Sequence, residues 1–387
     1  MGGITIVGGG IAGMVAAIAC AEAEAEVTLL EAHDDLGGRA RSTEGRYRAN
    51  LGPHVLYKDG PFCRWLRDRD LMPATRGVPL APIRFRWQGE LRRTPPLATA
   101  PAVLRLRGRE APADREFRSW ATEHTDERTA QILSAAAGVY TFHHDPGELS
   151  AEFIWGRTVR ALLNAPPPAR YVIGGWTALV EKLEGRARAL GVRIETGHCV
   201  TALPASPVIV ATELCQAREL LGDDSLDWLS GRTVCLDLGV EHRRGDPFVV
   251  SDLDEAGWLE RHTAVDAGLA PRGEELIQAQ MPIRPDESAD QAGLRLERLI
   301  GLAMPDWRER ETWRRRTVME GRTGALDLPG TTWADRPAVD RGDGVFVAGD
   351  MMASPGLLSE VASGSGLEAA RLAVEALAPS RPALRAA

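Results

Sequence analysis

The stretch "ITIVGGGIAGMVAAIACAEAEAEVTLLEA" (residues 4–32) decides the fold of the amino-terminal part of this chain. It begins with a β-branched run, Ile4–Val7, passes through a glycine-rich turn and an alanine-rich helix, and reaches a second apolar run that ends at Glu31. This strand–turn–helix–strand order is typical of the first unit of a Rossmann-type parallel α/β sheet.

Three glycines in the turn, Gly8, Gly10 and Gly13, satisfy the GxGxxG spacing of dinucleotide-binding proteins, and Glu31 ends the next strand 23 positions after Gly8. Gly8 permits the tight turn, Gly10 lets the backbone approach a pyrophosphate, and Gly13 lets the helix pack closely on the sheet. The helix N-terminus supplies N–H groups and a positive dipole, and Glu31 accepts hydrogen bonds from a ribose diol. The alternative, a glycine turn with no ligand, is disfavoured by this context, but the fingerprint alone does not separate NAD from FAD.

Further strand–turn–helix patterns lie far along the chain. Residues 174–200 predict a helix followed by a strand, and residues 207–212 ("PVIVAT") predict a short buried strand. Residues 344–356 ("GVFVAGDMMASPG") predict a strand that runs into Gly349 and delivers Asp350 into a loop.

The intervening sequence differs in composition and predicts a second domain. It is rich in proline, contains a hairpin pattern with Gly89 at its turn, and has helical patterns at about 114–137 and 150–164. We therefore expect a discontinuous nucleotide-binding domain of residues 1–74, 175–232 and 333–378, a substrate domain of residues 75–174 and 233–332, and a flexible tail at 379–387.

Motifs after Glu31 carry a resemblance to a known family. "DDLGGRARS" (34–42), "ANLGPHVLY" (49–57), the 174–200 segment, "VFVAGD" and "SEVASGSGLEAA" resemble, in the same order, motifs of the FAD-dependent amine oxidase, phytoene desaturase and protoporphyrinogen oxidase superfamily. The resemblance spans nearly the whole chain. It implies an α/β Rossmann-type FAD-binding domain of the glutathione-reductase-like, amine-oxidase kind, joined to an α+β substrate domain with a mixed sheet.

The resemblance also implies roles for single residues. Asp350 would bind the ribityl chain, the helix beginning near Ser359 would approach the pyrimidine edge of the flavin, and Val200 would contact the adenine through its backbone. Arg39 would neutralise the pyrophosphate, and the Gly52-Pro53-His54 loop would lie beside the isoalloxazine. The full set of expected FAD-binding residues is Gly8, Gly10, Ile11, Ala12, Gly13, Glu31, Ala32, Gly38, Arg39, Gly52, Pro53, His54, Val200, Gly349, Asp350 and Ser359.

Several side chains are candidates for chemistry or for lining a cavity. His54 is the catalytic candidate because its pKa range suits proton transfer, with cofactor packing as the alternative. Three tryptophans (Trp87, Trp155 and Trp176) are candidates for a cavity wall, although such residues more often belong to a core. The run His143–Asp145 reads as a turn, and no metal site is expected there.

The expected function is removal of a hydride from a C–H bond of a small, largely apolar substrate, by desaturation or oxidation, with flavin N5 as the acceptor. A flavin-dependent amine oxidase is an alternative, weakened because Lys58 and Lys182 are the only lysines and neither suits the lysine that many amine oxidases place near N5. A non-redox isomerase on the same fold also stays open, as does, remotely, a non-catalytic binding protein of the GDP-dissociation-inhibitor kind. The chain has one dinucleotide fingerprint, so we expect the electrons to leave to dioxygen, a quinone or a carrier protein.

Composition narrows the remaining classes. The net charge of −8 and the pI near 5.6 argue against a nucleic-acid-binding surface, and no apolar run reaches the roughly 18–20 residues of a membrane span. The five cysteines show no CxxC spacing, which favours reduced thiols and a cytoplasmic protein. Because none of them lies near the Ser359 motif, FAD is expected to be non-covalent.

Overall fold

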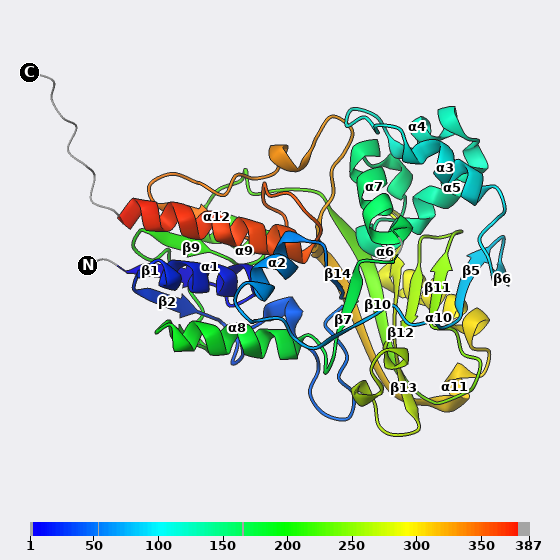
Figure 1. The fold of residues 1–387 in the computed structure, drawn as a ribbon, viewed down its shortest axis with the longest axis horizontal. Helices are drawn as coiled ribbons and strands as arrows, with labels where there is room; N and C mark the ends of the chain where they lie inside the picture. Colours follow the sequence, from blue (N-terminus) through cyan, green and yellow to red (C-terminus); the bar gives the residue numbers. More distant parts are fainter. Residues whose placement is uncertain (1–2, 53, 165, 378–387) are drawn as a thin grey trace, which may run out of the picture. The chain divides into compact units, whose positions relative to one another are not determined.

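A computed structural model describes residues 3–52, 54–164 and 166–377, which form two compact units (Figure 1). The first unit comprises the described parts of 1–38, 180–227 and 337–387, and the second comprises those of 39–179 and 228–336. The tail expected at 379–387 lies outside the described residues, as does Pro53.

The first unit is built on a five-stranded sheet in the order β15-β9-β1-β2-β8, in which every pairing is parallel. The strands are short and mostly buried, as expected of a sheet that is covered on both faces. They are β1 (Ile4–Val7), β2 (Val27–Leu30), β8 (Arg193–Glu195), β9 (Val208–Val210) and β15 (Val345–Val347).

Helices α1 and α12 of this unit pack closely against each other (Figure 1). A Cβ atom at Gly366 of α12 would lie 2.5 Å from the carbonyl oxygen of Ala12 in α1, so glycine is required at this crossing. The helices assigned wholly or mainly to the unit are α1 (Ile11–Glu22), α8 (Thr177–Ala189), α9 (Leu214–Leu221) and α12 (Ser359–Leu377).

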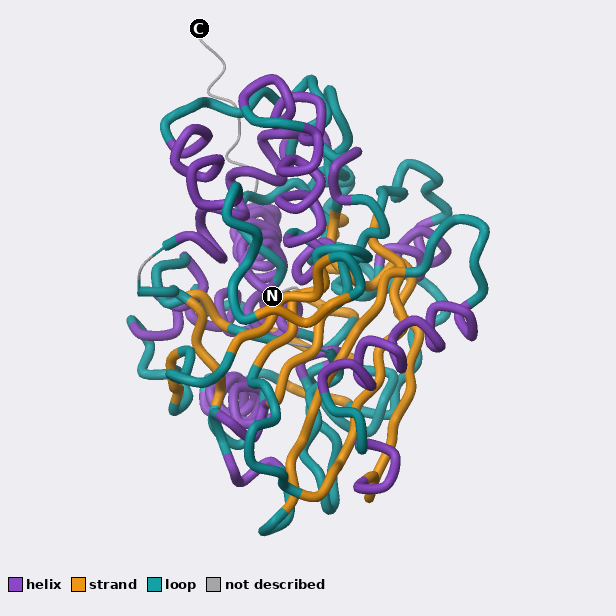
Figure 2. The backbone as a smooth tube through the Cα atoms, turned by 90° about the vertical axis from the view of Figure 1, so that its right-hand side faces the viewer, coloured by secondary structure: helices purple, strands orange, loops and turns teal. Residues whose placement is uncertain are grey.

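The second unit contains a seven-stranded sheet in the order β14-β10-β13-β12-β11-β5-β6, whose long strands are prominent in Figure 2. Only the β11–β5 pairing is parallel, so the sheet is mixed, as expected from the resemblance. The strands are β5 (Ile83–Trp87), β6 (Glu90–Arg92), β10 (Ser230–Glu241), β11 (Val249–Asp252), β12 (Trp258–Arg261), β13 (Glu274–Pro282) and β14 (Glu311–Ala325).

A smaller sheet and a set of helices complete the second unit. The small sheet has the order β3-β7-β4, from strands Leu56–Tyr57, Ala169–Val172 and Thr75–Gly77. The helices are α2 (Pro61–Arg67), α3 (Thr99–Arg107), α4 (Phe117–His124), α5 (Glu127–Ala136), α6 (Gly138–Thr141), α7 (Ala151–Thr158), α10 (Ala289–Ala303) and α11 (Trp307–Arg310).

The two faces of the seven-stranded sheet differ in chemistry. Alternate residues of β10 and β13, such as Leu236, Leu238 and Ile277, form one hydrophobic core with α10. The residues between them point to the opposite face and are polar, yet they are buried as well. This buried polar face carries Thr233, Asp237, Glu260, Gln278 and Gln280.

Local predictions are confirmed with two differences. The hairpin of β5 and β6 turns at Gln88 and Gly89, as expected. The helix expected over 114–137 is two helices, because Asp126 interrupts it and its Oδ1 accepts from Thr129 N (3.0 Å), capping α5. The pattern over 150–164 is α7 followed by a wider helical turn at Val159–Leu163.

Residues 39–74 differ from the expected domain division, because they fold with the second unit. Leu56 pairs with Arg170 in the small sheet, and the backbone of Asn50 accepts a hydrogen bond from Gln278 (2.9 Å). These contacts join the segment to the second unit, although in sequence it directly follows the glycine motif.

Candidate functional site

The glycines of the turn after β1 have two different roles. Gly8 and Gly13 lie against other parts of the chain, whereas Gly10 faces open space. Gly8 has φ +104°, and a Cβ there would lie 2.6 Å from the carbonyl oxygen of Ala211, whereas a Cβ at Gly13 would overlap the carbonyl oxygen of Gly8. At Gly10 a Cβ would meet no atom of the described residues within 4 Å. Two glycines therefore serve the packing of the chain on itself, and the third leaves room for a ligand.

That open space lies at the N-terminus of α1. Gly10 is the N-cap residue and provides no side-chain cap, and the first intrahelical bond runs from Met14 N to Gly10 O (2.9 Å). The preceding N–H groups, of Ile11, Ala12 and Gly13, lie in the first turn, whose N–H groups a helix leaves unsatisfied. An anion such as a pyrophosphate fits this position.

Glu31 holds the end of β2 to the glycine turn. Its carboxylate is buried, with Oε2 2.6 Å from Gly9 N and Oε1 3.0 Å from His33 N and 2.8 Å from His33 Nδ1. The role of Gly9 was missed by the sequence reasoning, which used only the spaced glycines of the fingerprint. A carboxylate oxygen can accept more than one hydrogen bond, so a ribose diol fits beside these partners.

The chain after β8 runs beside the segment that follows Glu31. His198 N donates to Glu31 O (2.8 Å) and Gly197 N donates to His33 O (2.9 Å). Val200 lies two residues after His198, and Ala32 is exposed between the two hydrogen-bonded positions Glu31 and His33. Ala32 and Val200, two of the residues expected to bind FAD, therefore lie at the same edge of the first unit.

The segment that carries Asp350 is fixed by a serine. Gly349 N donates to Ser365 Oγ (3.0 Å), and the same Oγ lies 2.9 Å from the carbonyl oxygen of Gly349. Ser365 is fully buried in α12. The sequence reasoning placed Gly349 and Asp350 in the site but missed Ser365, which ties their turn to the last helix.

The N-terminus of α12 begins at Ser359, as expected, and has a buried acidic residue in its first turn. Glu360 is 2% exposed, and its Oε2 accepts from Leu357 N (2.9 Å). A carboxylate here offsets part of the positive end of the helix dipole. Any anionic group placed at this helix end would therefore meet a weaker positive potential than an uncapped helix provides.

In the second unit, His54 is held by backbone and ring contacts. Its Nε2 lies 2.8 Å from the carbonyl oxygen of Arg39, and its ring centroid lies 4.9 Å from that of Trp176. A carbonyl can only accept, so Nε2 carries the proton and Nδ1 is the nitrogen with a lone pair. Gly52 has φ +133°, and a Cβ there would lie 3.2 Å from the His54 ring.

The guanidinium of Arg39 donates to the carbonyl oxygen of Arg322 in β14. Gly38, which precedes it, has φ +50° and belongs to the first unit, where a Cβ would lie 3.7 Å from Gly10 Cα. The described residues thus place Gly38 beside the glycine turn.

Two of the three tryptophan candidates are core residues. Trp155 belongs to the core of α4, α5 and α7, and Trp87 packs with Ile132 and Leu253, so for both the core alternative holds rather than the cavity wall. Trp176 is also buried, but its Nε1 has no hydrogen-bond partner among the described residues.

The histidine run after α6 has a structural role. His143 Nδ1 lies 2.9 Å from Asp145 O, and Asp145 caps the following turn and pairs with Arg118. Among the described residues no group of three or more His, Cys, Asp or Glu side chains is arranged to hold a metal ion.

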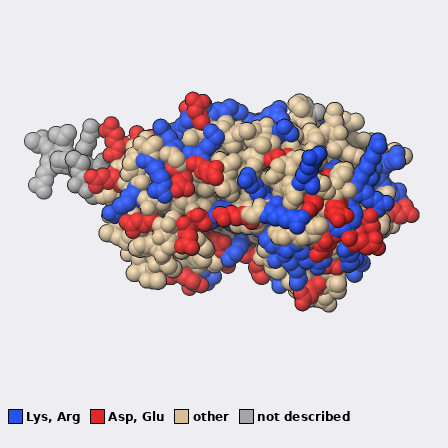
Figure 3. Space-filling view, turned by 90° about the horizontal axis from the view of Figure 1, so that it is seen from below, with Lys and Arg blue, Asp and Glu red and all other residues tan. Residues whose placement is uncertain are grey.

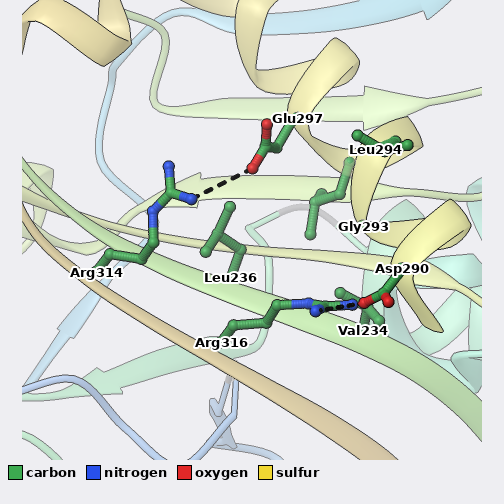
Figure 4. Close-up of a pocket in the computed structure, with 9 residues that line it drawn as sticks. Val234, Leu236, Asp290, Gly293, Leu294, Glu297, Arg314 and Arg316 are labelled. Carbon is green, nitrogen blue, oxygen red and sulfur yellow. Dashed lines mark hydrogen bonds and ion pairs between the residues drawn. The ribbon is translucent and has the colours of Figure 1, made fainter.

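A pocket of about 290 Å³ lies elsewhere, between α10 and strands β10 and β14 (Figure 4). Its floor is apolar, and its charged side chains pair with each other: Arg316 lies 2.7 Å from Asp290 and Arg314 lies 3.4 Å from Glu297. This pocket has no feature of a dinucleotide site.

The surface view shows Lys and Arg atoms side by side with Asp and Glu atoms over much of the face drawn (Figure 3). No described helix combines the length and the apolar character that crossing a bilayer requires.

Comparisons with known proteins agree with this architecture. A family described as NAD(P)-binding Rossmann-like domain matches residues 6–67, which include the glycine turn and Glu31. No match is found among curated protein sequences.

Three solved structures are similar over almost the whole chain. A putrescine oxidase variant is 17% identical, with a TM-score of 0.76 and coverage of 96% of this chain and 99% of its own. An oxidoreductase from Methanosarcina mazei is 14% identical, with a TM-score of 0.74 and coverages of 95% and 99%. Reduced UDP-galactopyranose mutase is 12% identical, with a TM-score of 0.71 and coverages of 98% and 97%.

These likenesses show the fold. The expected architecture is confirmed: the chain has a Rossmann-like unit with a parallel sheet and a unit with a mixed sheet, the fold also seen in the putrescine oxidase variant and the Methanosarcina mazei oxidoreductase.

Proposed function

We propose that this protein is an FAD-dependent oxidoreductase that binds FAD non-covalently. The observation that carries the proposal is the open space over Gly10 at an uncapped helix N-terminus, next to the buried carboxylate of Glu31. Phosphate and ribose require this pair of features at adjacent strand ends. The similar structures include an oxidoreductase and an amine oxidase by name, which supports the reaction class.

The first unit would bind most of the dinucleotide. The N–H groups of Ile11 to Gly13 would bind the pyrophosphate, Glu31 would accept from the ribose, and Asp350 would accept from the ribityl hydroxyls. Arg39, Val200, Ser359 and the loop 52–54 are assigned to FAD by the motif resemblance.

When bound, FAD supplies a hydride acceptor, its N5 atom, for a C–H bond of a small organic substrate. The proton that the substrate releases would be taken up by a side chain, for which His54 is the candidate. Its Nε2–H donates to Arg39 O, so Nδ1 is the nitrogen that would accept this proton. Electrons would then leave to dioxygen, a quinone or a carrier protein.

Two other activities remain candidates on the same fold. Oxidation of a C–N bond is favoured by the likeness to a putrescine oxidase, and an isomerase is favoured by the likeness to UDP-galactopyranose mutase. Anaerobic mixing with substrate separates them, because a net oxidation bleaches the flavin and an isomerisation does not.

The first test is the visible spectrum of the purified protein before and after heat denaturation. We expect a yellow protein that releases free FAD into the supernatant, and colour retained by the precipitate would contradict the non-covalent assignment. A colourless protein that FAD does not reconstitute would overturn the proposal.

A variant makes this test specific to the glycine turn. Gly10→Ala introduces a methyl group where the fold has room, so the protein should fold but lose most of its FAD. Gly185→Ala is the matched control, because its Cβ also meets no described atom within 4 Å and it lies on α8. Equal FAD content in the two variants would argue against binding at Gly10.

A further inference from the structure

The buried polar face of the seven-stranded sheet, in the second unit, contains hydrogen-bonding atoms without partners. Gln278 is 2% exposed and Trp176 is 3% exposed. Gln278 Oε1 and Trp176 Nε1 have no hydrogen-bond partner among the described residues. A buried polar atom without a partner is costly, so a water molecule or a ligand group would stabilise each of these atoms.

The orientation of the Gln278 amide is fixed by two acceptors. Its Nε2 donates to Asn50 O (2.9 Å) and to Asp237 Oδ1 (2.8 Å). Rotating the amide would place its oxygen against two other oxygens, so Oε1 cannot exchange places with Nε2. Oε1 is therefore a fixed acceptor without a donor.

Asn50 is hydrogen-bonded to both residues that carry the unpartnered atoms, and each of its two oxygens accepts two hydrogen bonds. Its Oδ1 accepts from Trp176 N (3.1 Å) and from Ser42 Oγ (2.9 Å), and its carbonyl oxygen accepts from Gln278 and from Arg315 Nη2 (2.7 Å). Gln278 and Trp176 are thus neighbours of one residue, and the oxygens of Asn50 accept from other donors and not from Trp176 Nε1.

The charges of the surrounding groups limit what could be bound there. Asp237 is paired with Arg315, whose Nε lies 2.7 Å from Oδ2, and burial raises the pKa of the Asp237 carboxyl while Arg315 opposes the rise. Across the sheet, Glu260 accepts from the Tyr171 hydroxyl and from Trp258 Nε1 (3.4 Å). His262 Nε2 is also buried without a hydrogen-bond partner, 3.8 Å from Glu260 Oε2.

This environment selects a class of ligand. A carboxylate would face the oxygens of Gln278 and Glu260, and a hydrocarbon would leave both unpartnered atoms unsatisfied. A hydroxyl or an uncharged amine has one hydrogen to donate to Gln278 Oε1 and one lone pair to accept from Trp176 Nε1.

We propose that Gln278 and Trp176 form a subsite that binds a hydroxyl or uncharged amine group of the substrate. The identification of its occupant as substrate rests on the proposed function, whereas the existence of the subsite does not. It replaces the expectation of a largely apolar substrate with one that carries at least one such polar group. The two residues are specificity determinants in this proposal, and no part in hydride transfer is assigned to them.

The test uses the full-length protein as purified, with its FAD content recorded, and follows the indole N–H signals of its ten tryptophans by ¹⁵N NMR. The signal that disappears in Trp176→Phe is assigned to Trp176. Cyclopentanol, cyclopentylamine and cyclopentane are then titrated, because they match in shape and differ in the polar group. We expect the alcohol or the amine to shift the Trp176 signal and cyclopentane to leave it in place.

The pH dependence of the affinities of the two polar probes distinguishes a hydroxyl group from an amine. Cyclopentylamine is protonated at pH 7, and only its neutral form accepts a hydrogen bond, so its affinity should rise with pH while that of cyclopentanol stays constant. Whichever probe binds more tightly identifies the polar group of the substrate.

Variants test the acceptor. Gln278→Leu should weaken binding of the polar probe by roughly tenfold or more. Gln280→Leu is the matched control, because Gln280 lies two positions away on the same face but both ends of its amide have partners, Thr233 and Gly138. It should bind the probe as the unmodified protein does.

Three results would each overturn the proposal: no shift of the Trp176 signal with either polar probe, equal binding of cyclopentane, or unchanged affinity in Gln278→Leu. If Gln278→Leu fails to fold, Trp176→Phe gives the same comparison by calorimetry with cyclopentanol. Failure of the FAD proposal would be recognised separately. The purified protein would then contain no flavin, while the polar probe would still shift the Trp176 signal.

Discussion

The hydroxyl of Ser365 lies within hydrogen-bonding distance of both backbone groups of Gly349, 3.0 Å from N and 2.9 Å from O. Gly349 immediately precedes Asp350, so the position of that carboxylate depends on Ser365, which lies 16 positions after Gly349 in the chain. The closing strand and the last helix therefore act together in presenting Asp350.

Replacing this serine should affect both stability and FAD binding. Ser365→Ala leaves the Gly349 N–H without its acceptor, which should lower the free energy of unfolding by about 1–3 kcal/mol. Release of FAD should become easier because Asp350 loses its support. Urea unfolding and FAD titration of the apoprotein measure the two effects.

The matched control for this prediction is Ser363→Ala. Ser363 is also buried in α12, but its hydroxyl donates only to Glu360 O within the helix (3.1 Å). FAD affinity as strongly reduced in Ser363→Ala as in Ser365→Ala would contradict a specific role for the Gly349 contact.

The acidic residue at the start of α12 should lower the reduction potential of bound flavin. Glu360→Gln keeps an oxygen to accept from Leu357 N but removes the negative charge at the positive end of the helix. If this helix end faces the flavin, the midpoint potential should rise by roughly 10–40 mV, which corresponds to about 0.5–2 kcal/mol for two electrons. Spectroelectrochemistry of the holoprotein measures it.

Glu368→Gln provides the comparison, because Glu368 lies two turns further along α12 and pairs with Arg371 at the surface. Its potential should match that of the unmodified protein. A potential that is unchanged in Glu360→Gln would separate this helix end from the flavin.

The crossing of α1 and α12 should tolerate no side chain at Gly366. In Gly366→Ala the new methyl group would lie 2.5 Å from Ala12 O, so the helices must move apart, at a cost of about 1–3 kcal/mol in the free energy of unfolding. Gly301→Ala in α10 is the control, since its Cβ would make only an ordinary contact, 3.8 Å from Trp307 Nε1. Thermal unfolding of equal severity in both variants would contradict the proposed tight crossing.

The buried carboxyl of Asp252 should make stability depend on pH in a direction opposite to that of most carboxylates. Burial raises the pKa of this group from 3.8 to about 6, although Arg86 Nη1 lies 2.8 Å from its Oδ2. Between these values the folded protein binds the proton more tightly than the unfolded chain does. The contribution is therefore present below about pH 4 and is lost as the pH rises through 6, by on the order of 3 kcal/mol.

Asp252→Asn should flatten this slope, measured as the difference in unfolding free energy between pH 4.5 and pH 7 by urea denaturation. Asp254→Asn is the control, because Asp254 lies in the adjacent loop and accepts from Gln88 N and Gly89 N (2.8 Å each). If Asp252→Asn and the unmodified protein show the same pH difference, burial does not raise this pKa.

The geometry of the glycine turn and of Glu31 could be predicted from sequence because its determinants are local. Gly8, Gly10, Gly13 and Glu31 lie within one strand–turn–helix–strand stretch, where spacing and backbone geometry determine their roles. Ser365 could not be found in this way, since a serine inside a helix gives no pattern that points to a turn 16 residues earlier.

The alternation of polar and apolar residues in β10 fits two arrangements, a polar face in water or a polar face that is buried. In β10 the residues alternate as Cys235, Leu236, Asp237, Leu238, which normally indicates a strand with one face in water. Here both faces are buried, and on the polar face Gln278 donates to Asn50 O while Gln280 donates to Gly138 O. Only the tertiary structure shows that the alternation is a buried hydrogen-bonding network and that residues 39–74 belong with it.

The strand order of the first unit has a consequence for synthesis of the chain. β9 lies between β1 and β15, and α12 packs on α1, so the sheet begun at Ile4 is completed only by residues 345–377. Translation at about 5–20 residues per second separates these elements by many seconds, during which β1, β2 and α1 lack their neighbours. A nascent chain can fold the second unit around its own core in that interval, but the Rossmann sheet closes only after β15 has left the ribosome, and α12 packs on α1 later still. The FAD binding proposed for this unit is thereby deferred until residues 345–377 have emerged.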